Sequence, residues 1–169
     1  EAPEPSVSVS SGSSTASATP SASVTPSPTV TESGPPIPAA AREQTEAGAE
    51  AFVRFYIDQS ARAWTEADPS QLEGLATGAC ATCANLQATA TSLKAEGQRY
   101  SATPVKVGAL SSFRDADTQQ VFDAELQEQK VSILAADGEI VESFPARSVT
   151  TAIAVVWREG RWWLDAIGE

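Results

Sequence analysis

The chain has 169 residues, contains no histidine and carries a formal net charge of −11 at neutral pH. This length is sufficient for one domain with a hydrophobic core, and no apolar run approaches the ~20 residues that a membrane-spanning helix needs. The acidic balance argues against nucleic-acid binding, which requires clustered Lys and Arg, and against docking to an anionic membrane through charge.

Residues 1–38 differ in composition from the rest of the chain, because Ser, Thr and Pro dominate them. Such a segment cannot bury enough apolar surface to offset the conformational entropy that is lost on folding. The sequence therefore predicts a disordered stalk, an extended and partly polyproline spacer that holds a domain away from an anchor. The alternative is an inert disordered terminus. Residues 39–169 are predicted to form a single domain.

Apolar residues recur at helical spacing over residues 39–64, which predicts one long amphipathic helix. Asp68 followed by Pro69 has the pattern of a helix N-cap and a first helical residue, so a short second helix is expected to follow. A third helix is predicted over residues 82–95, with Gly97 as its C-terminal stop.

After the third helix the apolar period changes to two residues, the period of a half-buried strand. The predicted strands cover residues 104–113, 120–127 and 131–135. Asp137-Gly138 predicts a hairpin turn, with a return strand that starts at Ile140. Helices come first and strands afterwards, so the predicted fold class is α+β, with the helices packed on one face of an antiparallel sheet.

The stretch Ser148–Ile167 gives the strongest strand signal, two β-branched and aromatic runs separated by Glu159-Gly160. Gly160 can adopt the positive φ that a tight primed turn requires. With these two residues as the loop, Trp157 lies opposite Trp162 in the predicted hairpin.

The two faces of this hairpin differ in polarity. One face is uniformly apolar and is expected to lie on the core; it carries Thr151, Ile153, Val155, Trp157, Trp162, Leu164 and Ala166. The other face carries Ala152, Ala154, Val156, Trp163, Asp165 and Ile167. A bare indole is uncommon on a monomer, so Trp163 is expected to be covered by a helix, a curled sheet edge, a second protomer or a ligand.

Cys80-Ala-Thr-Cys83 is the motif with the clearest chemical character, and several interpretations compete. A zinc site would need further Cys or His ligands, which the chain lacks, so no metal or other cofactor is expected. A redox pair and two free thiols are alternatives. A structural disulfide is the favoured interpretation, because this spacing can close at the first turn of a helix and would hold the preceding turn against that helix.

The order of elements resembles the nuclear-transport-factor-2-like superfamily, in which a curved antiparallel sheet wraps around a long N-terminal helix. The segment Gly160–Asp165 is similar to the closing hairpin of that superfamily. More narrowly, the stalk, Glu50–Tyr56, Cys80-x-x-Cys83 and the Trp-rich end resemble an uncharacterised family of actinobacterial lipoproteins. The resemblance implies a cone-like fold and a lipid anchor upstream of Glu1. The chain is then extracytoplasmic, at the outer face of the cell membrane, and contacts the membrane only through this anchor.

Three functional hypotheses fit these features, and the sequence names neither a ligand nor a partner. The first is a non-catalytic binding or interaction module for an unknown protein or small ligand, with Tyr56, Trp157, Trp163 and Asp165 as candidate pocket or interface residues. The alternative is a small isomerase- or dehydratase-like enzyme that uses a buried carboxylate; its candidates are Tyr56, Asp58, Asp123 and Asp165. The third is an assembly domain that forms a homodimer through the sheet face of Trp163.

Overall fold

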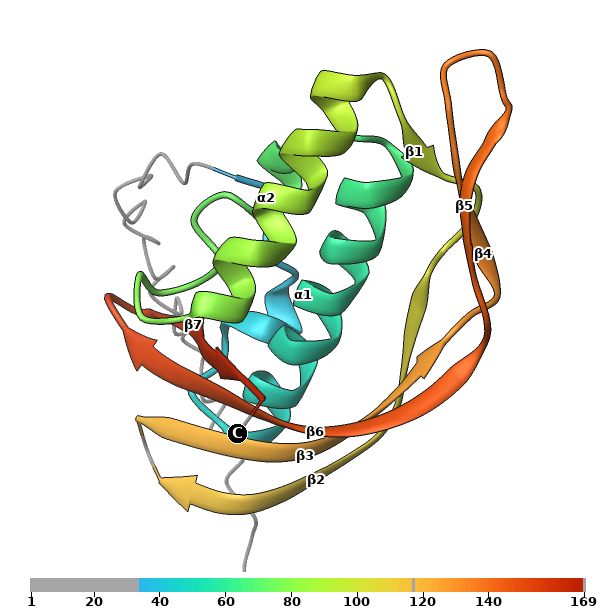
Figure 1. Ribbon diagram of the computed structural model, residues 1–169. Helices are drawn as coiled ribbons and strands as arrows, with labels where there is room; N and C mark the ends of the chain where they lie inside the picture. Colours follow the sequence, from blue (N-terminus) through green and yellow to red (C-terminus); the bar gives the residue numbers. More distant parts are fainter. Residues whose placement is uncertain (1–33, 117, 169) are drawn as a thin grey trace, which may run out of the picture. The chain divides into compact units, whose positions relative to one another are not determined.

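The structure, a computed structural model, describes residues 34–116 and 118–168 (Figure 1). Residues 1–33, most of the predicted stalk, lie outside the described residues. Within residues 34–38, which the sequence also assigns to the stalk, Ile37 is 5% exposed and belongs to the core. Its carbonyl accepts a hydrogen bond from Arg42 Nε at 2.8 Å. The folded domain therefore includes residues that precede position 39, because the apolar side chain of Ile37 is buried in it.

The predicted helix over residues 39–64 is divided into a 3-10 turn, η1 (Ala39–Arg42), and a long helix, α1 (Glu46–Thr65). The break falls before Thr45, whose backbone is extended and whose hydroxyl oxygen accepts a hydrogen bond from the amide of Gly48 at 3.0 Å. A threonine N-cap provides a partner for an amide that the first turn of a helix leaves unpaired. The long helix therefore starts after Thr45 and not at residue 39.

Two further helical segments follow α1. The expected short helix is a single 3-10 turn, η2 (Pro69–Leu72), and α2 (Ala81–Glu96) agrees with the predicted third helix to within one residue at each end. Asp68 caps η2 by accepting a hydrogen bond from the amide of Ser70, and Gly97 ends α2 in the left-handed conformation at φ 65°. In the part of the chain that the structure describes, no helix is long and apolar enough to cross a membrane.

Within the described residues the strands form two antiparallel sheets. The four-stranded sheet has the order β2-β3-β6-β7, with β2 (Val105–Ala116), β3 (Gln119–Glu128), β6 (Arg147–Arg158) and β7 (Arg161–Ile167). The three-stranded sheet has the order β1-β4-β5, with β1 (Arg99–Tyr100), β4 (Val131–Leu134) and β5 (Ile140–Phe144). Figure 1 shows the four-stranded sheet curving beneath α1, with α1 and α2 on its concave side. The predicted fold class, helices packed on a curved antiparallel sheet, is confirmed.

The core lies between α1 and the concave face of the sheet. Phe52 and Tyr56 of α1 are buried there together with Trp162 and Leu164 of the final hairpin. Trp157 is partly buried and packs against the same cluster. The long helix and the final hairpin thus share one continuous core, as the apolar patterns of both segments require.

The final hairpin has the predicted register near its turn, where Trp157 lies opposite Trp162. Glu159 and Gly160 form the turn with φ values of 54° and 78°. Positive φ at both central residues is the geometry of a type I′ turn, whose twist matches that of the strands it joins.

A β-bulge at Asp165 changes the faces of the strand beyond it. Leu164 and Ala166 lie opposite adjacent residues of β6, so Asp165 is an extra residue in β7. An inserted residue moves every later side chain to the other face of the sheet. Ala166 is therefore exposed, and Ile167 packs against the core. The predicted placement of Ala166 on the core face and of Ile167 on the opposite face is wrong for this reason.

The outer edge of β7 is covered by residues 75–77, which we call the edge cover. The amide of Thr77 donates to the carbonyl of Leu164 at 2.8 Å, and the amide of Leu164 donates to the carbonyl of Leu75 at 2.9 Å. The Thr77 hydroxyl also donates to Oδ1 of Asp165 at 2.7 Å, which holds the bulge in place. These bonds satisfy strand groups that would otherwise be open to pairing with another chain.

The predicted disulfide joins Cys80 and Cys83 at the first turn of α2. The sulfur of Cys80 also accepts a hydrogen bond from the amide of Cys83 at 3.2 Å, so Cys80 is the N-cap of this helix. The edge cover precedes the disulfide by a few residues. The disulfide therefore constrains the short connection between the edge cover and α2.

Candidate ligand-binding cavity

A cavity of about 320 Å³ lies between the two long helices and the strands. Its wall is mostly apolar and includes Ile57, Leu86, Val105, Leu126, Val131 and Ile167. Protein pockets that bind small molecules have volumes of about 300–1,000 Å³ and are lined mainly by apolar side chains. This cavity therefore has the size and the lining of a site for a small ligand.

Three aromatic side chains, which we call the aromatic row, contribute to the wall of the cavity. Tyr100 of β1 stacks against Trp64 of α1, with ring centroids 5.3 Å apart, and against Phe144 of β5, with centroids 6.0 Å apart. Nε1 of Trp64 donates to the carbonyl of Leu86 at 3.0 Å, which fixes the indole relative to α2. The row is thus a preformed aromatic surface built from three separate elements.

Two aliphatic hydroxyl groups in the wall already have partners within the protein. The Ser60 hydroxyl donates to the carbonyl of Tyr56 at 3.0 Å, and the Thr82 hydroxyl donates to the carbonyl of Ile167 at 2.9 Å. Because these donors are used, this part of the wall offers a ligand mainly apolar contact.

Charged groups are found among the more exposed residues of the cavity. Glu128 and Arg147 both line it and form an ion pair, in which Nη2 of Arg147 lies 3.2 Å from Oε1 of Glu128. Burial and, to a lesser degree, the negative charges of Glu142 and Glu128 raise the pKa of Tyr100. Tyr100 is therefore a neutral phenol near pH 7, and its hydroxyl forms no hydrogen bond with the described residues.

Tyr56, a candidate residue from the sequence, is buried in the core and does not line this cavity. It lines a smaller cavity of about 220 Å³ beside the disulfide, together with Cys80 and Cys83. Burial raises the pKa of Tyr56, and a hydrogen bond with Ser60 opposes the shift without cancelling it. The phenol thus stays protonated, and the structure places it as a core aromatic.

Trp157 and Trp163 lie on the final hairpin and do not line the 320 Å³ cavity. Trp157 packs edge-on against Trp162, with ring centroids 5.2 Å apart. Nε1 of Trp163 donates to the carbonyl of Arg158 at 3.1 Å, and the guanidinium carbon of Arg161 lies 3.8 Å from the centroid of the Trp163 ring. Part of the cover that Trp163 was expected to need is thus an arginine of its own strand, held by a cation–π contact.

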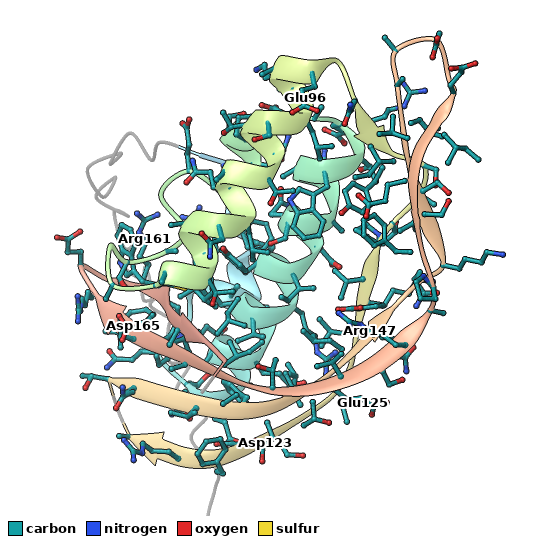
Figure 2. The ribbon with its side chains drawn as sticks, viewed as in Figure 1. Glu96, Asp123, Glu125, Arg147, Arg161 and Asp165 are labelled. Atoms are coloured by element: carbon teal, nitrogen blue, oxygen red, sulfur yellow. A yellow bond between two sulfur atoms is a disulfide. The ribbon has the colours of Figure 1, made fainter. Side chains whose placement is uncertain are left out.

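The candidate carboxylates are not brought together in a cavity. Asp58 and Asp123 are exposed, and Asp165 is bound to the Thr77 hydroxyl at the bulge. Figure 2 shows Asp123 on the side of the sheet that faces away from the helices. Among the described residues the buried polar side chains are Gln59, Ser60 and Gln120, so none of them is a carboxylate. The part of the chain that the structure describes contains no group of three or more His, Cys, Asp or Glu side chains placed to bind a metal ion.

The aromatic row cannot be recognised as a unit from the amino-acid sequence. Trp64, Tyr100 and Phe144 are far apart in the sequence, and each lies at or near the end of its element. They meet because β1 pairs with β4 and β4 pairs with β5. The hairpin turn at Asp137-Gly138 predicted the pairing of β4 with β5, but nothing in the sequence predicted the pairing of β1 with β4, which brings Tyr100 beside Phe144.

Comparison with solved structures found proteins whose folds are similar to that of this chain. The intermembrane space region of the chloroplast protein ARC6 is 17% identical, with a TM-score of 0.56, over 72% of this chain and 92% of that one. An uncharacterised Caulobacter vibrioides protein with a cystatin-like fold is 13% identical, with a TM-score of 0.49, over 75% and 88% of the two chains. The protein Aln2 from a Streptomyces species is 14% identical, with a TM-score of 0.44, over 70% and 88%. At these identities the likeness concerns the fold alone.

A comparison with curated proteins found no match. A protein family described as a family of unknown function, DUF6318, matches residues 14–167, which include nearly all of the described structure. The match covers well over half of the chain, and the chain therefore belongs to the DUF6318 family.

Proposed function

We propose that this domain is a non-catalytic binding module whose cavity takes an apolar small molecule. The observation that carries the proposal is the aromatic row, Trp64, Tyr100 and Phe144, in the wall of a cavity of about 320 Å³. Such a wall provides affinity through apolar contact and shape. The candidate carboxylates of the enzyme hypothesis lie outside this cavity, so binding without chemistry is the function that the geometry favours.

The module is proposed to work outside the cytoplasm, at the outer face of the cell membrane, tethered by a lipid anchor upstream of Glu1. Disulfides persist in oxidising compartments, and the Cys80–Cys83 bond supports this location. The Ser/Thr/Pro-rich composition of the residues before Ile37 supports a spacer between the anchor and the domain. Two reactive thiols in freshly prepared, unreduced and denatured protein would contradict this part of the proposal.

Filling the cavity is expected to abolish binding. Leu126 lines the cavity from β3, and Leu126→Trp would place an indole in the space that a ligand needs. We expect the wild-type chain to bind 1-naphthalenemethanol, a neutral aromatic alcohol, and the variant to bind it at least ~10-fold more weakly, as measured by isothermal titration calorimetry.

Gln127→Trp is the matched control, because it adds the same side chain to the next residue of β3, which is exposed. It is expected to leave the affinity unchanged. An equal loss of affinity in both variants, or no binding of the alcohol by the wild-type chain, would overturn the proposed function.

Self-association through the outer face of the final hairpin is a second part of the proposal, supported by Trp163, which is only partly buried beneath Arg161. A two-fold contact would bury this surface on both copies. Trp163→Ser is expected to weaken self-association in sedimentation velocity. In urea unfolding it should lower the free energy of unfolding by only about 1 kcal/mol, because the indole lies outside the core. A wild-type chain that stays monomeric at all concentrations, or a large loss of stability with unchanged association, would contradict it.

A further inference from the structure

We infer that the ligand of the 320 Å³ cavity is an organic cation, an amine or a quaternary ammonium group carried on an apolar or aromatic body. This inference rests on the proposed function and adds the charge of the ligand. It follows from two carboxylates that act on the aromatic row and from the chemistry of the row itself.

The charges around the cavity are unequal. Glu128 lines the cavity, and Glu142 lies on β5 two residues before Phe144 of the aromatic row. Both carboxylates act on the Tyr100 hydroxyl, where their negative charges oppose its ionisation. Arg147 is the positive group of the cavity wall, and it is already paired with Glu128. Glu142 lines a neighbouring cavity and forms no ion pair within the described residues, so the negative charge that it exerts on the Tyr100 hydroxyl is not neutralised by an ion-pair partner.

The aromatic rings of the row also favour a positively charged ligand. The faces of aromatic rings carry negative electrostatic potential and attract ammonium groups, most strongly where water is excluded. Tyr100 is stacked against both other rings of the row, so Trp64 and Phe144 are the rings that can offer a face to such a group. The Tyr100 hydroxyl has no hydrogen-bond partner in the part of the chain described, so it can accept a hydrogen bond from a primary ammonium group.

The overall charge of the protein acts in the same direction. The chain has a formal net charge of −11, which raises the local concentration of cations and lowers that of anions. An anionic ligand would have to compete with Glu128 for Arg147 and would lie near Glu142. A neutral ligand would gain no attraction between opposite charges from these carboxylates. A cation is the occupant that complements Glu128 and Glu142, the two carboxylates that act on Tyr100.

Three ligands of nearly the same shape separate these cases: 1-naphthylmethylammonium, 1-naphthalenemethanol and 1-naphthoate. In calorimetric titrations of the full 169-residue chain at low salt, we expect the cation to bind about 5–10-fold more tightly than the alcohol, and the anion more weakly than both. Equal affinities for cation and alcohol, or tighter binding of the anion, would overturn the inference and leave the proposed function intact. Binding of none of the three would overturn both.

Two charge variants identify the groups responsible. Glu142→Gln is expected to reduce the advantage of the cation over the alcohol by about 2–3-fold, with no change in the affinity for the alcohol. Glu128→Gln leaves Arg147 without its carboxylate and is expected to make the anion bind more tightly than the cation. Asp123→Asn is the control, because it removes one charge from the opposite side of the sheet (Figure 2) and should leave the order of the ligands unchanged. The same loss of cation preference in all three variants would show a general charge effect and would contradict a site-specific one.

Discussion

Replacing Trp162 by Ala is expected to lower the free energy of unfolding by about 3–5 kcal/mol, the largest effect of any single substitution considered for this chain. The side chain is 1% exposed and packs edge-on against Trp157. Its Nε1 donates to the carbonyl of Glu43 at 2.7 Å, which ties the final hairpin to the segment just before α1. The variant would therefore lose apolar contact and also one of the two hydrogen bonds that the Glu43 carbonyl accepts.

Urea unfolding followed by far-UV circular dichroism measures this loss without relying on tryptophan fluorescence. Trp162→Phe is the matched control: it keeps a ring in the core and loses the Glu43 hydrogen bond, so we expect a smaller loss of about 1–2 kcal/mol. A loss below about 1 kcal/mol for Trp162→Ala would contradict the position of the hairpin in the core.

Gly48→Ala is expected to destabilise the domain by about 2–3 kcal/mol, although alanine is the better helix former by roughly 1 kcal/mol. Gly48 lies in the first turn of α1, and a methyl group there would overlap the backbone carbonyl oxygen of Glu43. That carbonyl accepts hydrogen bonds from the amide of Thr45 and from the Trp162 indole. It is therefore held in place and cannot move aside without breaking them.

Gly78→Ala is the matched control for this substitution. No heavy atom lies within 4 Å of the added methyl group, and the backbone of Gly78 does not have a positive φ. We expect a gain in stability of about 0.4–1 kcal/mol, because alanine reduces the freedom of the unfolded chain. Thermal unfolding measures both changes: the melting temperature should fall in Gly48→Ala and rise in Gly78→Ala. A stabilised Gly48→Ala would show that the approach of Glu43 to α1 is not close.

The elements that could be predicted from the sequence are those whose pattern is local. The α+β class follows from helical spacing followed by alternation, and the turn at Glu159 and Gly160 fixes the pairing of Trp157 with Trp162. The start of α1 was misplaced because alanine-rich residues before Thr45 have helical propensity, while the cap at Thr45 determines where the long helix begins.

The features that could not be predicted depend on contacts between distant segments. The bulge at Asp165 is held by the Thr77 hydroxyl, which lies on a different part of the chain, and it moves Ile167 into the wall of the cavity. The aromatic row likewise exists only once β1, β4 and β5 have paired. Periodicity within one segment carries no information about either arrangement.

The edge cover over β7 limits how copies of this domain can assemble. Residues 75–77 occupy the hydrogen-bonding groups of Leu164, so a strand from a neighbouring molecule finds no free partners at that position. Pairing of a neighbouring molecule's strand with this part of β7 is thereby prevented. The self-association proposed for the outer face of the final hairpin would be of a different kind, because a two-fold contact closes after two members and gives a finite pair and not a filament.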